Sequence, residues 1–134
     1  MTKMHLKQWN IALWVAQVLL GVMFSMAGAM KMTTPILELA ESMNWVNETP
    51  EWLVRFIGVC EILAGFGLIL PSLLRIKPKL TVLAAIGLVI VMVLAMVDHI
   101  MLGEYKMIGI NVSFALLAAF VAWGRSKKVV ISEN

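Results

Sequence analysis

The sequence predicts an all-α integral membrane protein, a four-helix bundle that forms a single domain over residues 1–134. The chain is 61% hydrophobic and only 14% of its residues are charged. Its apolar residues form four runs of about 20 residues, the length of helix that crosses a bilayer. A soluble domain of this size could not cover so much apolar surface, because small proteins leave a large share of the chain exposed.

The four runs comprise residues 9–30, 52–70, 80–102 and 107–123, and each is predicted to be a transmembrane helix. A helix satisfies its own backbone in lipid, and no run alternates like a barrel strand. The first run follows Lys3 and Lys7 as a signal peptide would, but its length favours a retained helix. The Thr-Pro-Glu segment 49–51 is a start signal for the second helix, and Pro71 is expected to end it.

Residues 35–43 are predicted to form a short amphipathic helix in the first loop. Thr34 and Pro35 form a helix cap followed by a first-turn proline. Apolar side chains then recur with helical spacing, at Ile36, Leu39, Ala40 and Met43. We expect this helix to lie on the outer membrane surface or to cover the end of the bundle.

The distribution of Lys and Arg predicts the orientation. Eight lie at the termini or in the loop between the second and third runs: Lys3, Lys7, Arg75, Lys77, Lys79, Arg125, Lys127 and Lys128. Lys31, Arg55 and Lys106 lie on the other side. Because cytoplasmic loops are enriched in Lys and Arg, both termini are predicted to be cytoplasmic, in the cell (inner) membrane. The same basic residues at the termini and in the loop account for the pI of about 9.3. Because membrane topology explains their positions, no nucleic-acid partner is expected.

Small and polar residues recur at helical spacing on one face of each run, as they do where helices pack together in lipid. On the first two helices the packing glycines are Gly21, Gly28, Gly58 and Gly65. The third predicted face comprises Ala84, Gly87, Val91, Leu94 and Asp98, and the fourth comprises Asn111, Ala115, Ala118 and Ala122. These four faces predict a compact bundle with a partly polar interior.

Glu61 is the strongest candidate for a functional residue. It lies ten residues into the second helix, about 15 Å from the outer end and therefore near the membrane midplane. A charge at that depth costs roughly 2–4 kcal/mol or more, so the carboxyl group must be paired, neutral or hydrated. It is a candidate ligand-binding or proton-carrying group. The alternative is a structural role, in which Glu61 forms an interhelical hydrogen bond or ion pair that holds the helices together.

Lys31 and Arg55 are the candidate partners of Glu61. We expect Arg55 to reach Asp98 or Glu61 across the interior, and the alternative for both bases is to extend to the outer headgroups. Of the adjacent Asp98 and His99, we expect Asp98 to face inward. His99 is a candidate quinone hydrogen-bond donor or proton relay, or else a residue of the headgroup boundary.

Asn111 is expected to form an interhelical hydrogen bond or to contact a ligand, and Gln17 is expected to join helices. The polar residues of the outer half would form a funnel with Glu61 as its floor. No metal site is predicted. A haem would need a second axial ligand, and the only other histidine, His5, lies across the membrane. A zinc site would have one histidine and two carboxylates on separate helices, without a ligand spacing pattern. The single cysteine, Cys60, excludes a dithiol mechanism within this chain and is expected to be inert packing.

Two sequence patterns resemble the DoxX-like family of small membrane proteins. The pattern Arg-x-x-Gly-x-x-Glu of residues 55–61 resembles the family's second helix, and Gly-x-x-Phe-x-x-x-Gly-x-x-Lys of residues 21–31 resembles its first. The resemblance extends over nearly the whole chain and implies a four-helix membrane fold. It places Lys31, Arg55 and Glu61 at the family's characteristic polar positions, whereas Asp98 and Asn111 match less closely.

The resemblance implies fold more firmly than activity. The family is named after a small subunit of a thiosulfate:quinone oxidoreductase, and other bacterial members are associated with quinone, catechol or thiol stress. Some distant eukaryotic relatives act as assembly or trafficking chaperones. We therefore expect a redox-associated accessory subunit that binds a quinone or another apolar small molecule. It would act with a redox partner protein or as a homo-oligomer, and not as a self-sufficient enzyme. Two alternatives stay open: a non-enzymatic assembly factor, and a small proton-linked exporter.

Overall fold

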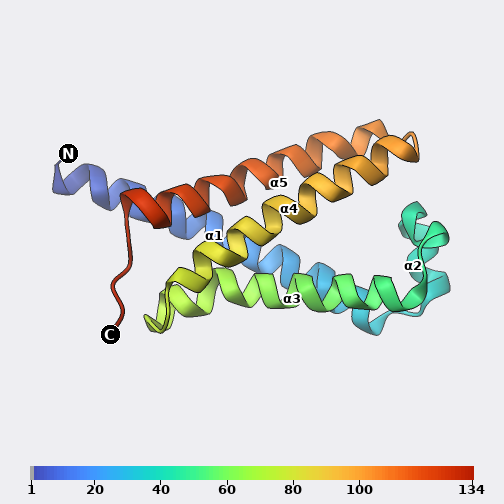
Figure 1. Ribbon diagram of the computed structural model, residues 1–134, viewed down its shortest axis with the longest axis horizontal. Coiled ribbons are helices and arrows are strands. Elements are labelled where there is room, and N and C mark those ends of the chain that lie inside the picture. The colour runs from blue at the N-terminus through green and yellow to red at the C-terminus, as the bar shows by residue number, and fades with distance from the viewer. Residues whose placement is uncertain (1) are drawn as a thin grey trace.

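The computed structural model describes residues 2–134, and every regular element in that range is helical (Figure 1). The long helices are α1 (Lys3–Thr33), α3 (Glu51–Leu74), α4 (Lys79–Met101) and α5 (Tyr105–Trp123). Between α1 and α3 lie a short α-helix, α2 (Ile36–Ser42), and a 3-10 helix, η1 (Asn44–Glu48). A π-helical turn, η2 (Gly124–Lys128), extends α5. The four long helices are long and apolar enough to cross a membrane, as the sequence predicts.

The long helices pack as two antiparallel pairs, α1 with α3 and α4 with α5 (Figure 1). Contacts between α3 and α4 join the pairs, and α1 touches α5 less extensively. The N-terminus, the α3–α4 turn and the C-terminal segment lie at one end of the molecule, called here the terminal end. The elements α2 and η1 and the α4–α5 turn lie at the other, called here the α2 end.

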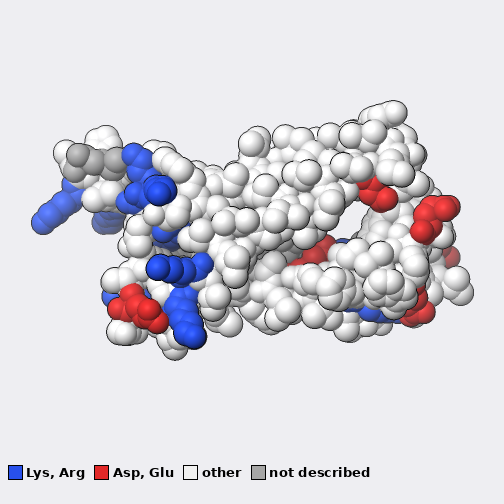
Figure 2. Space-filling model, viewed as in Figure 1, with Lys and Arg blue, Asp and Glu red and all other residues white. Residues whose placement is uncertain are grey.

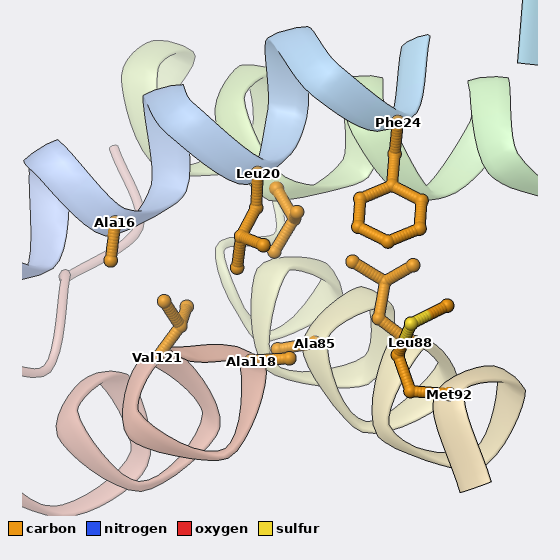
Figure 3. Close-up of a cluster of buried hydrophobic side chains, with 9 residues drawn as sticks. Ala16, Leu20, Phe24, Ala85, Leu88, Met92, Ala118 and Val121 are labelled. Atoms are coloured by element: carbon orange, nitrogen blue, oxygen red, sulfur yellow. The ribbon is translucent and has the colours of Figure 1, made fainter. Parts of the chain in front are cut away.

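An apolar core joins all four helices in the middle of the bundle and towards the terminal end. It consists of Ala16, Leu20, Phe24, Leu68, Ala85, Leu88, Met92, Ala118 and Val121. Phe24 closes this core on the side of the α2 end, where its ring faces Leu88 and Met92 (Figure 3) and packs edge-on against Phe114. The core residues mark the inward face of each long helix. Polar side chains that lie on the same face, further towards the α2 end, are therefore also directed inward.

The backbones of α1 and α3 approach closely through glycine. A methyl group added to Gly58 would lie 2.9 Å from the carbonyl oxygen of Gly28 and 2.9 Å from Cβ of Lys31. A methyl group on Gly28 would collide with the carbonyl oxygen of Gly58, and Gly21 and Gly65 are equally crowded. Small residues at such contacts are how helices gain packing energy in lipid, where apolar burial gives little. The α1–α3 pair therefore depends on these glycines.

Helix boundaries differ from the expected ones at two places. Helix α1 begins at Lys3, six residues before the predicted apolar run. Helix α3 continues past Pro71 to Leu74 and ends at Arg75, which has left-handed backbone angles. A proline removes one helical hydrogen bond, a loss that membrane helices tolerate near their ends. The extra turn lets the hydroxyl of Ser72 hydrogen-bond to that of Thr81 on α4, at 2.8 Å.

The inward face of α4 lies one residue later than predicted. The structure buries Thr81, Ala85, Leu88, Met92 and His99. The predicted face of Ala84, Gly87, Val91, Leu94 and Asp98 is rotated by one position, about 100° round the helix. Leu94 is exposed, and a methyl group added to Gly87 would meet no atom within 4 Å. Gly87 is therefore not a packing glycine.

A helix is present at the site predicted for the short loop helix. Its residues Ile36, Leu39 and Ala40, and Met43 directly after it, pack with Val46 of η1 and Val54 of α3 in a second apolar cluster. Leu39 and Val54 are almost completely buried. This cluster anchors the α1–α3 connection against α3, whereas contact of α2 with a membrane surface stays a prediction.

Replacing Gly28 by alanine should separate α1 from α3 and lower stability. We expect Gly28→Ala to cost about 1–3 kcal/mol, because an overpacked contact forces backbone movement. Gly87→Ala is the matched control, since its methyl group enters open space. Melting temperatures of the purified variants in detergent would test this, and an equal loss of stability in both variants would contradict it.

Candidate functional site

A buried ion pair links α1 to α3. Nζ of Lys31 donates a hydrogen bond of 2.8 Å to Oε2 of Glu61, and both side chains are more than nine-tenths buried. Lys31 lies in the last turn of α1, and Glu61 lies in the middle of α3. The lysine stem therefore runs back along α1 to reach the acid. Of the two candidate partners of Glu61, the structure therefore pairs it with Lys31.

Arg55 caps the end of α1 instead of reaching Asp98 or Glu61, which corrects the expectation. One of its terminal nitrogens donates to the carbonyl oxygens of Lys31 and Thr34. The Lys31 carbonyl would normally accept the N–H of the residue four positions later, which is Pro35 and has none. The guanidinium supplies the missing donor. Its other terminal nitrogen contacts the exposed Glu51 at 3.0 Å.

The Arg-x-x-Gly-x-x-Glu pattern therefore acts as a clamp on the end of α1. Successive turns of α3 present Arg55 to the last carbonyl groups of α1, Gly58 to its backbone and Glu61 to Nζ of Lys31. The spacing of three residues keeps these groups on one side of α3. Much of the polar pattern is thus explained by packing.

His99 faces the interior on α4, and Asp98 is exposed, which is the reverse of the expectation. The two differ by about 100° in direction, so the shift in the buried face decides between them. Nδ1 of His99 hydrogen-bonds to Oε2 of Glu104 at 2.8 Å, across the α4–α5 turn. Glu104 was not a predicted site residue, and its proximity depends on the tightness of this turn.

Asn111 of α5 is buried, with only 7% of its surface exposed. Its amide nitrogen has no hydrogen-bond partner among residues 2–134. A buried donor left unpaired costs about 1–3 kcal/mol. This nitrogen therefore does not form the interhelical hydrogen bond that was one of the two roles expected for Asn111. The amide is therefore available to a group from outside the chain.

Each long helix directs one polar side chain inward, two turns beyond the apolar core. These polar residues, called here the polar layer, are Lys31, Glu61, His99 and Asn111. Each is seven positions, about 10 Å along its helix, from a buried core residue: Phe24, Leu68, Met92 and Ala118, respectively. Figure 2 shows the molecule opened at the α2 end, between the α4–α5 pair and the α2–η1 segment, with acidic side chains at the rim.

A second polar cluster, at the terminal end, was not predicted as a site. Arg125 is only 3% exposed and donates to Oε1 of Gln17 at 2.6 Å and to Oδ1 of Asn10 at 2.7 Å. Gln17 in turn donates to the carbonyl of Leu68, so it joins helices as expected. Arg125 was expected among the cytoplasmic charges of the C-terminus, but η2 continues α5 and buries Gly124 and Arg125.

A model of the DoxX-like family matches residues 15–121 of this chain. The chain belongs to the DoxX-like family. This match confirms the resemblance drawn from residues 21–31 and 55–61, and it includes residues of all four long helices. No curated protein and no solved structure matches the chain significantly. Within the described part of this DoxX-like protein, no three His, Cys, Asp or Glu residues are grouped so as to hold a metal ion.

Breaking the Lys31–Glu61 pair from one side should destabilise the protein more than removing both partners. We expect Lys31→Met alone to cost about 3–5 kcal/mol, because it leaves a buried acid unpaired, and Lys31→Met/Glu61→Met to recover much of this loss. The free energy of unfolding in detergent measures both. Glu51→Gln is the control, since its exposed contact with Arg55 is worth at most about 1 kcal/mol. Additive losses in the double variant would contradict the pairing.

Proposed function

We propose that this DoxX-like protein is a redox-associated accessory subunit that binds a quinone, or a similar apolar carbonyl compound, in the polar layer. The observation that carries the proposal is the unpaired amide nitrogen of Asn111, buried on the inward face of α5. A carbonyl oxygen of the ligand would accept its hydrogen bond and remove the cost of an unsatisfied donor. The opening at the α2 end would admit such a ligand (Figure 2).

The other polar groups beyond the apolar core suit the chemistry of quinone reduction. A quinone takes up two electrons and two protons to give a hydroquinone, so it needs proton carriers beside its carbonyl groups. The Lys31–Glu61 and His99–Glu104 pairs each combine a basic group with an acidic one at 2.8 Å. The single cysteine cannot form a dithiol couple, so we assign the electrons to a redox partner protein.

We also propose that the α2 end faces outward from the inner membrane and that both termini are cytoplasmic. On the face shown in Figure 2, Lys and Arg side chains gather mainly at the terminal end, and most acidic side chains lie at the α2 end. This asymmetry agrees with the preference of cytoplasmic loops for Lys and Arg. The quinone site would then open towards the outer half of the bilayer.

A second candidate function is assembly of another membrane protein. It is favoured by the clamp on α1, in which Arg55, Lys31 and Glu61 already have partners within the chain. Aromatic side chains at the α2 end, Trp52 and Tyr105, are strongly exposed and would be available to a partner. Mild crosslinking followed by purification separates the two functions, since a stoichiometric membrane partner without a bound small molecule supports assembly.

Quinone binding should raise the melting temperature of the wild type but not that of Asn111→Leu. The leucine variant removes the unpaired donor, so without quinone it should be at least as stable as the wild type. We expect decylubiquinone or a soluble menaquinone to raise the melting temperature of the wild type by several degrees, and the shift in Asn111→Leu to fall below a third of that value. Ser113→Ala, at an exposed position of the same helix, should keep the full shift. No shift in the wild type would refute the proposal.

Labelling of single cysteines tests the orientation. In a Cys60→Ala background, a cysteine at Glu41 should react with a membrane-impermeant maleimide added to intact spheroplasts, because α2 is proposed to face outward. A cysteine at Ser132 should react only after the membrane is permeabilised. The opposite labelling pattern would reverse the proposed topology.

A further inference from the structure

The terminal end contains a cavity of about 380 Å³ that the proposed quinone site does not use. It lies between the start of α4, the turn η2 and the C-terminal segment. Its polar lining comes from Ser72, Lys79, Arg125 and Ser126, and the rest of its lining is mainly aliphatic. A volume of this order suits a small ligand or part of a lipid.

Arg125 brings an uncompensated charge to this cavity. Its side chain is almost completely buried, and it forms no ion pair with a carboxylate in the described part of the chain. Its partners are neutral: the amide oxygens of Gln17 and Asn10, the carbonyl of Val129 and the ring of Trp14, whose centre is 5.2 Å from the guanidinium carbon. Its second terminal nitrogen, Nη2, has no partner among residues 2–134.

A buried cation of this kind favours an anion nearby. Removing a charge from water costs several kcal/mol, and neutral acceptors offset only part of that cost. Lys79 adds a second positive charge to the lining of the same cavity. Basic pockets between helices, close to the membrane surface, are suited to anionic lipid headgroups.

An apolar groove continues from the cavity along the α4–α5 pair. The groove, of about 370 Å³, shares Val82, Ile86 and Ser126 with the cavity and extends to Ile90 and Ala119. From Val82 to Ile90 it follows α4 for about 12 Å, away from the terminal end. An acyl chain attached to a headgroup in the cavity would run in this direction, parallel to the helices.

We propose that the cavity and groove together form a binding site for one anionic phospholipid, with its phosphate beside Arg125 and Lys79 and one acyl chain in the groove. Charge complementarity selects the headgroup, and the continuous apolar groove selects a lipid over a free anion. The C-terminal residues Val130 and Ile131 line one side of the cavity and would cover the headgroup. The bound lipid would therefore stabilise the contact between α4, η2 and the C-terminal segment.

The test compares ligands that share only part of this chemistry. Purified protein in detergent receives phosphatidylglycerol, phosphatidylcholine or inorganic phosphate, and its melting temperature and the lipid retained in native mass spectra are measured. We expect phosphatidylglycerol to raise the melting temperature by several degrees and to remain bound as one molecule, and the other two to do neither. Equal effects of both lipids, or an equal effect of inorganic phosphate, would overturn the proposal.

Variants at exposed positions locate the site while Arg125 and its hydrogen-bond partners are left unsubstituted. Ser126→Glu places a carboxylate beside Arg125 and should weaken phosphatidylglycerol binding at least tenfold, whereas Ser126→Gln, of the same size, should change it less than twofold. Ala119→Trp fills the groove and should reduce retention of the lipid, whereas Leu116→Trp, exposed on α5 outside the groove, should not. Unchanged binding in both Ser126→Glu and Ala119→Trp would overturn the assignment.

Discussion

The close approach of α1 and α3 at Gly28 and Gly58 is the contact on which the rest of this structure depends. Because the two backbones nearly touch, Lys31 can form a direct hydrogen bond with Glu61. For the same reason, Arg55 can replace the donor that Pro35 lacks. In lipid, apolar side chains gain little by leaving the solvent, so small residues and polar bonds must supply the association energy. The glycines and the ion pair are therefore parts of one interaction. Moving the backbones apart would leave a buried acid without its base.

The Lys31–Glu61 pair satisfies its own charges and does not need a further buried polar group on α4 and on α5. The polar layer nevertheless includes His99 on α4 and Asn111 on α5, each two turns beyond the apolar core. The apolar core joins the four helices as far as Phe24 and Met92, and beyond it α4 and α5 diverge from α3 towards the α2 end (Figure 1). Packing of α1 on α3 accounts for the pairing of Lys31 with Glu61. It does not account for the buried amide of Asn111, which is why the hydrogen bond to the ligand is assigned to that amide and the ion pair is assigned only a proton-carrying role.

The buried faces of α1 and α3 could be predicted from sequence because their inward positions carry glycine or polar residues, which stand out from their aliphatic neighbours. Helix α4 offers no such marker: from Leu83 to Val97 it is almost uniformly aliphatic, and its one glycine, Gly87, faces open space. Its rotation is set by contacts with α3 and α5, which the sequence does not display. Because the predicted inward face was one residue too early, Asp98 was expected to face inward in place of His99. The burial of Arg125 was missed for a related reason, since counting charges for topology treats a basic residue after an apolar run as lying outside the membrane.

The two proposed sites lie at opposite ends of the bundle, and the apolar core separates them. A polar molecule in water would meet Arg125 and Asn111 only with difficulty, because both side chains are buried. Quinones and phospholipids instead dissolve in the bilayer and can approach from the side, through the opening at the α2 end and along the α4–α5 groove. Both ligands would then bind the α4–α5 pair. This pair packs less extensively against α1 than α3 does. A lipid that fixes the terminal end of this pair would also limit how far its other end can move from α1 and α3, and so influence the space available to the quinone.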